Sequence, residues 1–223
     1  MSANASLPVV EVAPAAVGSA AVERERLVAR ARLLAWVGLA WHVLEGGVAV
    51  AAGVVAGSVA LVGFGADSVI EAGAGVVVIW LMASGRSSSA RAERRAQRLI
   101  AASFVVLAAY VGVEALRDLL GGHHPAVSWV GVGLSVVTLL VMPPLAAAKR
   151  RVGEQLGSSA TASESRQTML CAYLSAILLG GLVLNATVGW WFADPIAGLA
   201  MVPIIMREGI NGVRGQSACG DCC

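Results

Sequence analysis

The sequence has little charge and few aromatic residues. Charged side chains make up 13% of its 223 residues and hydrophobic ones 57%, whereas a soluble domain carries about 25% charged residues. A chain of this length leaves no room for a large soluble domain beside its apolar segments. We therefore expect an all-α integral membrane protein, because helices satisfy their own backbone hydrogen bonds in lipid.

Several sequence motifs are also missing. No glycine-rich phosphate loop, nucleophile elbow or dinucleotide-binding fingerprint occurs in its required context. The sequence therefore predicts neither enzyme activity nor a cofactor. Its basic segments are too short for a nucleic-acid-binding module, and their arginines fit membrane topology and anionic lipid headgroups.

Cysteines are few and are not spread as in a disulfide-stapled fold. Cys171 lies in an apolar segment, whereas Cys219, Cys222 and Cys223 cluster near the end of the sequence. The terminal thiols resemble an incomplete metal motif. They could form a docking tail, a site shared between two subunits or a redox feature.

Six apolar runs predict six transmembrane helices, because about 20 apolar residues cross a bilayer. The predicted spans are residues 33–56, 58–82, 99–120, 126–148, 164–188 and 195–206. They form a membrane domain over residues 31–207. Residues 1–30 are expected to be a disordered tail to Ala21 and then a charged helical lead-in, since no signal-peptide pattern occurs. Residues 208–223 are expected to be a short cytoplasmic tail.

Basic residues are confined to one side of this predicted topology. Of the 16 Lys and Arg residues, all but Arg117 lie before the first span, around the even-to-odd connections or after the sixth span. Basic segments remain on the cytoplasmic side. Both termini are therefore expected in the cytoplasm, and the Ala-, Val-, Gly- and Arg-rich composition suggests the plasma membrane of a bacterium.

The second span contains two acidic residues, Asp67 and Glu71. They lie four positions apart and therefore share one helix face, where two unpaired carboxylates would repel. A carboxylate at the bilayer centre costs at least ~2.5 kcal/mol. The two groups could be protonated or make polar contacts within the bundle. We favour a cation site, because a bound cation would remove the repulsion.

The fifth span carries a second polar face, formed by Glu164, Gln167 and Cys171. If it meets the acidic face, carboxylate, amide and thiol groups come together, a set that suits Zn²⁺ better than Mg²⁺ or Ca²⁺. Alternatively, Cys171 is a small buried apolar residue and Gln167 makes an interhelical hydrogen bond. Glu164 is a less certain ligand than the other two.

Further polar groups occur within the first and third spans. His42 and Glu45 share one face of the first span and could extend a cation pathway or carry protons, although a His–Glu hydrogen bond is the simpler explanation. Glu114 in the third span could pair with an arginine or be protonated. His123 and His124 form a predicted outer loop and could collect metal or have no such role.

These residues resemble those of the cation diffusion facilitator, or cation efflux, family. The second span contains GSVALVGFGADSVIE, and family members carry an acidic pair at four-residue spacing there, matched by Asp67 and Glu71. Their fifth span holds a second pair, usually His and Asp, after a lead that Ser163–Ser165 resembles. The resemblance places Gln167 and Cys171 at this second pair.

The resemblance implies export of a divalent metal such as zinc in exchange for protons, by a homodimer. This chain departs from the family pattern by having Gln and Cys in place of His and Asp. It also looks like a compact branch without the cytoplasmic metal-binding domain that follows the sixth span. A non-transporting membrane protein that binds metal or regulates a partner is the alternative, and an organic-cation exporter ranks last.

Overall fold

The computed structural model describes residues 14–83, 90–157 and 159–213, and regular structure in these ranges is helical. The helices are α1 (Pro14–Ala56), α2 (Val59–Ala83), α3 (Ala90–Gly121), α4 (Trp129–Leu156), α5 (Ser159–Val188) and α6 (Ala193–Val213). The all-α prediction is thereby confirmed. The terminal cysteines lie outside the described residues.

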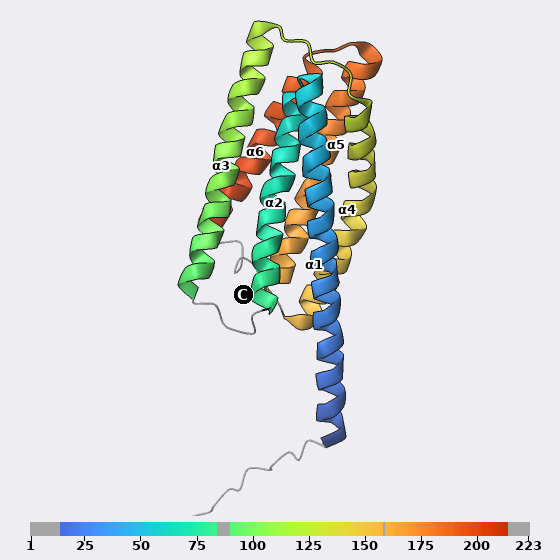
Figure 1. Cartoon of the computed structure of the whole chain (residues 1–223), viewed down its shortest axis with the longest axis vertical. Helices are drawn as coiled ribbons and strands as arrows, with labels where there is room; N and C mark the ends of the chain where they lie inside the picture. Colours follow the sequence, from blue (N-terminus) through green and yellow to red (C-terminus); the bar gives the residue numbers. More distant parts are fainter. Residues whose placement is uncertain (1–13, 84–89, 158, 214–223) are drawn as a thin grey trace, which may run out of the picture.

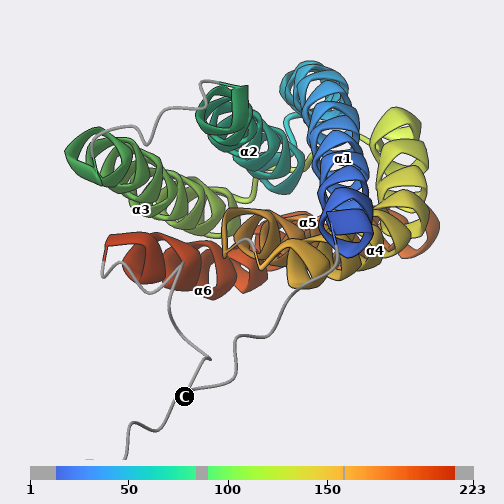
Figure 2. The ribbon, with the colours of Figure 1, turned by 90° about the horizontal axis from the view of Figure 1, so that it is seen from below.

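The helices alternate in direction and form one bundle (Figure 1). We call the lower end in that view, where α1, α3 and α5 begin, the basic end, because Arg32, Arg98 and Arg150 lie towards it. The upper end is called the Gly57 end. Helix α2 contacts α1, α3, α5 and α6, and α5 also contacts α4 and α6. Figure 2 shows this packing along the bundle. Helices α2 and α5 are therefore enclosed on several sides, and many of their side chains are buried between neighbouring helices.

Five helices are long and apolar enough to cross a membrane within the described ranges. Many large apolar side chains on their outer surface are exposed, among them Val55, Leu120 and Leu140. Such an apolar exterior is costly in water and suits contact with lipid. The sixth helix, α6, is 21 residues long and contains Asp194, Arg207 and Glu208.

Several helices extend beyond the predicted spans, among them α1 at its start and α4 at its end. Helix α1 begins at Pro14, so residues 14–21, expected in a disordered tail, are helical; their alanines favour helix. Helix α4 begins at Trp129, where the Ser128 Oγ accepts a hydrogen bond from Gly131 N, and it continues past Pro144 to Leu156. The predicted start near Pro125 is therefore wrong, because the N-cap lies at Ser128.

The Gly57 end is held by a tight turn and by side-chain hydrogen bonds. Gly57 has a φ of 65° between α1 and α2, a backbone conformation that glycine adopts readily. Ser58 follows, and its Oγ donates to Oδ1 of Asp194 at 2.5 Å, joining the starts of α2 and α6. Asn185 of α5 donates to the carbonyl of Pro125 at 3.1 Å. These bonds join the start of α2 to α6, and α5 to the loop before α4, at this end.

Glycines set the close approach of α1 to α2. A Cβ atom added at Gly65 would lie 2.7 Å from the backbone N of Val50, and one at Gly46 would lie 3.1 Å from the carbonyl O of Gly65. Small residues let membrane helices approach this closely. The contact turns one face of α1, including His42, towards α2.

Candidate metal centre

Helix α1 contributes two buried polar side chains. His42 is 5% exposed and Glu45 is 0% exposed, although each lies within an apolar helix. The Nδ1 atom of His42 lies 3.5 Å from Oε2 of Glu45, three residues further along the same face. Buried charged groups of this kind require partners, and further partners come from α2, α4 and α5.

Helix α2 places Glu71 opposite this pair. The Oε2 atom of Glu71 lies 3.2 Å from Nδ1 of His42, which is shorter than the 3.5 Å between that nitrogen and Glu45. Both atoms are buried and neither forms a hydrogen bond within the described part of the chain, despite this proximity. A buried polar atom without a hydrogen bond costs about 1–3 kcal/mol. A cation bound between them would satisfy both.

Helix α5 supplies the free thiol of Cys171, which is completely buried. Its Sγ donates to Oε2 of Glu45 at 3.5 Å. One potential ligand atom from each of His42, Glu45 and Cys171 lies within 4.8 Å of the other two. We call His42, Glu45, Glu71 and Cys171 the buried cluster. It brings nitrogen, oxygen and sulfur donors together from three helices.

Glu45 is held by two further hydroxyl groups. The Oγ of Ser68 donates to its Oε2 at 3.0 Å, and the hydroxyl of Thr138 on α4 donates to its Oε1. Such partners orient a ligand group and tune its basicity. The sequence analysis did not identify either residue. The sequence offered one indication of this contact, a single threonine in the middle of the apolar α4.

Asp67 is buried one turn from Glu71 on α2 but does not belong to the buried cluster. It is 3% exposed. Together with Glu71 it lines a small cavity of about 10 Å³, which Phe104, Ile205 and Glu208 also border. This volume corresponds to roughly one water molecule. Glu71 therefore belongs to the buried cluster and also borders this cavity, whereas Asp67 lines only the cavity, beside residues of α3 and α6.

The predicted polar face of α5 divides into separate environments. Cys171 joins the buried cluster. Gln167 is half-buried, and no hydrogen bond links it to the cluster in the described structure. Glu164 pairs with Lys149, with Oε1 and Nζ 2.7 Å apart. Lys149 follows the predicted fourth span in the sequence, but α4 extends beyond it and buries its side chain.

The other candidate residues lie away from the cluster. Glu114 accepts a hydrogen bond from Arg117 at 2.7 Å, so of the two predicted alternatives the structure has the arginine pair. His124 stacks on Trp191, with ring centroids 4.8 Å apart. His123 lies beside Gly57, where an added Cβ would approach its Nε2 to 2.8 Å. Neither histidine belongs to a group of metal-binding side chains among the described residues.

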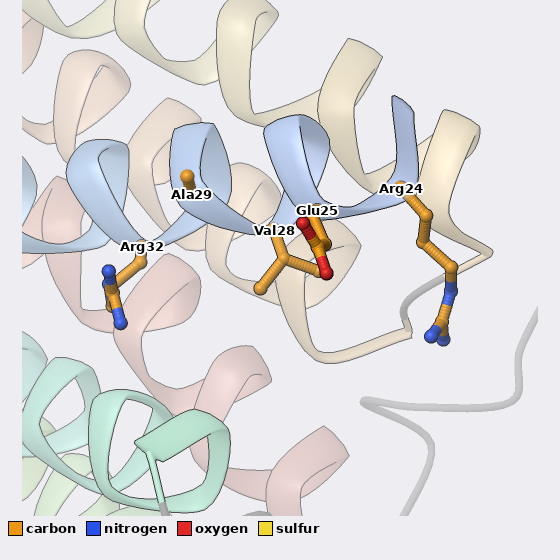
Figure 3. Close-up of a pocket in the computed structure, with 5 residues that line it drawn as sticks. All are labelled: Arg24, Glu25, Val28, Ala29 and Arg32. Carbon is orange, nitrogen blue, oxygen red and sulfur yellow. The ribbon is translucent and has the colours of Figure 1, made fainter. Parts of the chain in front are cut away.

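An open cavity of about 350 Å³ lies on α1 near the basic end. Its lining residues, Arg24, Glu25, Val28, Ala29 and Arg32, all belong to one helix (Figure 3). All five are exposed. The cavity offers one carboxylate and two guanidinium groups and lacks the donor set of the buried cluster.

The chain forms a bundle of helices of membrane-spanning length in which side chains able to bind a metal lie buried together. Residues 35–214 match the family model of the cation efflux transmembrane domain, and the chain belongs to the cation efflux family. No curated protein matches the chain. The chain is therefore a multi-pass membrane protein of a family that transports cations across membranes.

Proposed function

We propose that this protein exports a divalent metal cation such as zinc and that the buried cluster binds the ion during transport. The observation that supports this most strongly is the meeting of His42, Glu45 and Cys171 within 4.8 Å of one another. Glu71 adds a fourth group through its 3.2 Å approach to His42. Membership of the cation efflux family supports the transport role.

The donor set favours a borderline metal such as Zn²⁺. Zinc takes nitrogen, sulfur and carboxylate oxygen ligands, and four of them complete its tetrahedral coordination. Calcium requires six to eight oxygen ligands and magnesium a near-octahedral oxygen shell. A cluster with one imidazole and one thiol supplies too few oxygens for either. Zinc, or another metal that accepts thiolate and imidazole, is therefore the proposed cargo.

Proton exchange follows from the same ligands. A thiol must lose its proton and an imidazole must be neutral before they bind a metal. Loading of the ion onto Cys171 would therefore release a proton, and departure of the ion would restore it. Proton antiport needs no residue beyond the cluster.

Asp67 and Gln167 remain part of the proposed pathway. Asp67 would hold the ion as it passes between the small cavity and Glu71, because the two acids lie one turn apart on α2. Gln167 lies one turn from Cys171 on α5. Alternating access generally moves helices around such a central site. A homodimer with both termini in the cytoplasm is the assembly that we propose.

Zinc flux into proteoliposomes tests the proposal. We expect wild type to transport zinc in exchange for protons. The variants Asp67→Asn and Glu71→Gln should lose most of this flux. Unchanged flux in both variants would remove the acidic pair from the mechanism. If the purified protein binds zinc but wild type shows no flux, the protein is instead a non-transporting metal-binding or regulatory protein.

A further inference from the structure

Lys149 is the only lysine in the sequence, and it is almost completely buried. Its side chain is 1% exposed. Its Nζ donates to Oε1 of Glu164 at 2.7 Å and to Oγ1 of Thr168 at 3.1 Å. A buried ammonium is costly unless an opposite charge and hydrogen bonds compensate it. The lysine comes from α4 and both partners come from α5, so this compensation joins the two helices.

Helix α1 passes close to the same ammonium at Gly38. A Cβ atom added at Gly38 would lie 2.6 Å from Nζ of Lys149. Glycine therefore leaves the space into which the lysine extends. We call Gly38, Lys149, Glu164 and Thr168 the Lys149 layer. It joins α1, α4 and α5, which also supply side chains to the buried cluster and to its hydroxyl partners.

The Lys149 layer lies about one helical turn from the buried cluster, towards the basic end. Gly38 precedes His42 by four residues on α1, and Thr168 precedes Cys171 by three on α5. Both helices begin at the basic end (Figure 1). A cation that left the cluster along α1 and α5 would meet the Lys149 ammonium there. Like charges repel strongly in a medium of low dielectric constant.

We propose that Lys149 is a positioning residue for transport, whose ion pair with Glu164 closes the buried cluster towards the basic end. The pair separates when the site opens to that side. Alternating access requires one side of a central site to be closed while the other is open. The inference rests on the proposed function, because the closure matters only if an ion uses the cluster.

Reaction of the Cys171 thiol with a membrane-impermeant maleimide measures this closure. The terminal cysteines are first replaced by serine, so that Cys171 is the only thiol, and vesicles of both orientations are labelled without metal. A separate Cys171→Ser protein that keeps its terminal thiols shows which vesicle side faces the basic end, because those thiols follow α6 too closely to cross the membrane.

We expect slow labelling of the protein with an intact Lys149–Glu164 pair from both sides. The double variant Lys149→Met with Glu164→Gln removes the pair without leaving a buried charge. It should react at least roughly tenfold faster from the basic end, which corresponds to about 1.4 kcal/mol in the opening equilibrium. The charge-exchanged variant Lys149→Glu with Glu164→Lys restores an ion pair and should label slowly again.

The matched control is Glu154→Gln. It breaks the exposed Arg150–Glu154 pair, which lies on the same helix with an N–O distance of 3.6 Å. Labelling of this variant should equal that of the intact protein. Equal labelling of the double variant and the control, or faster labelling of the double variant from both sides, would overturn the closure and leave a purely structural ion pair.

Protection by zinc separates this inference from the proposed function. If zinc fails to slow Cys171 labelling in any variant, including the opened double variant, the proposed metal site is wrong. If zinc protects Cys171 but the double variant labels no faster than the control, the site stands and the closure by Lys149 is wrong.

Discussion

The buried cluster and the Lys149 layer are neighbouring polar groups, one turn apart, with opposite balances of charge. The Lys149 layer contains its own cation, whose Nζ lies 2.7 Å from Glu164. The buried cluster places Glu45 and Glu71 around a single imidazole, and Oε2 of Glu71 has no hydrogen-bond partner among the described residues. A carboxylate that is paired with a lysine can stabilise the fold, whereas a carboxylate that has no such partner can bind a mobile cation.

The buried cluster and the Lys149 layer share α1 and α5 but differ in their third helix, which is α2 for the cluster and α4 for the layer. Lys149 and Glu164 come from α4 and α5, which are neighbours in sequence and pack against each other. The cluster instead requires α1, α2 and α5 to meet. A change in the tilt of α1 or α2 would therefore alter the cluster more than the Lys149–Glu164 pair.

The largest effect on stability is expected from Lys149→Met alone. This change leaves the partly buried carboxylate of Glu164 without its cation. Removal of one partner of a buried ion pair lowers the free energy of unfolding by about 3–5 kcal/mol. Denaturant unfolding in detergent should show this loss, and Glu164→Gln in the same protein should recover much of it. No recovery would show that the two side chains are not coupled.

The next largest effect is expected from His42→Ala, measured as zinc affinity. Loss of a direct ligand should weaken binding by more than roughly 100-fold, because even residues that only orient a ligand contribute 10–100-fold. Unfolding should change much less than in Lys149→Met, since a buried Nδ1 that forms no hydrogen bond with the described residues is removed as well. An unchanged affinity would exclude α1 from the site. Isothermal titration calorimetry gives the affinity.

A smaller effect is expected from Thr138→Val, which removes a hydroxyl that donates to Glu45 but keeps the side-chain shape. Zinc affinity should fall by about 10-fold, the lower part of the range for such supporting groups. Ser135→Ala is the matched control on the same helix, because the Ser135 hydroxyl donates only to the carbonyl of Gly131. Equal affinities in the two variants would contradict the role of Thr138.

The smallest effect is expected from Glu154→Gln. Its pair with Arg150 is exposed and four residues apart on α4. Such pairs contribute about 0.3–0.5 kcal/mol, so the unfolding curve and the zinc affinity should both stay close to those of wild type. A loss comparable to that of Lys149→Met would mean that burial does not distinguish the two ion pairs.

Much of the fold could be predicted from the sequence, because long apolar runs and the placement of arginines depend on local composition. Asp67 and Glu71 could be singled out for the same reason, since two acids in an apolar run are conspicuous. His42 and Glu45 were ranked lower, because a hydrogen bond within one helix was the simpler explanation for them. The 3.2 Å approach of His42 to Glu71 depends on a rotation of α1 that no local pattern encodes.

Lys149 shows the other limit of sequence reasoning. It occurs in Lys149-Arg150-Arg151, which predicts a basic connection by the rule for membrane topology. Arg150 and Arg151 are indeed exposed, whereas Lys149 faces the bundle interior. The space that it fills is left by Gly38, more than a hundred positions earlier, and the sequence shows no link between the two residues.

The most direct test of the central claim is a titration of purified protein with Co²⁺, which reports thiolate binding through its charge-transfer absorption. Wild type, Glu45→Gln and Gln167→Ala are compared with the terminal cysteines replaced by serine. We predict a thiolate band in wild type and Gln167→Ala at similar affinity, and a strongly weakened one in Glu45→Gln. A band that survives in Glu45→Gln but disappears in Gln167→Ala would contradict the buried cluster as the metal site.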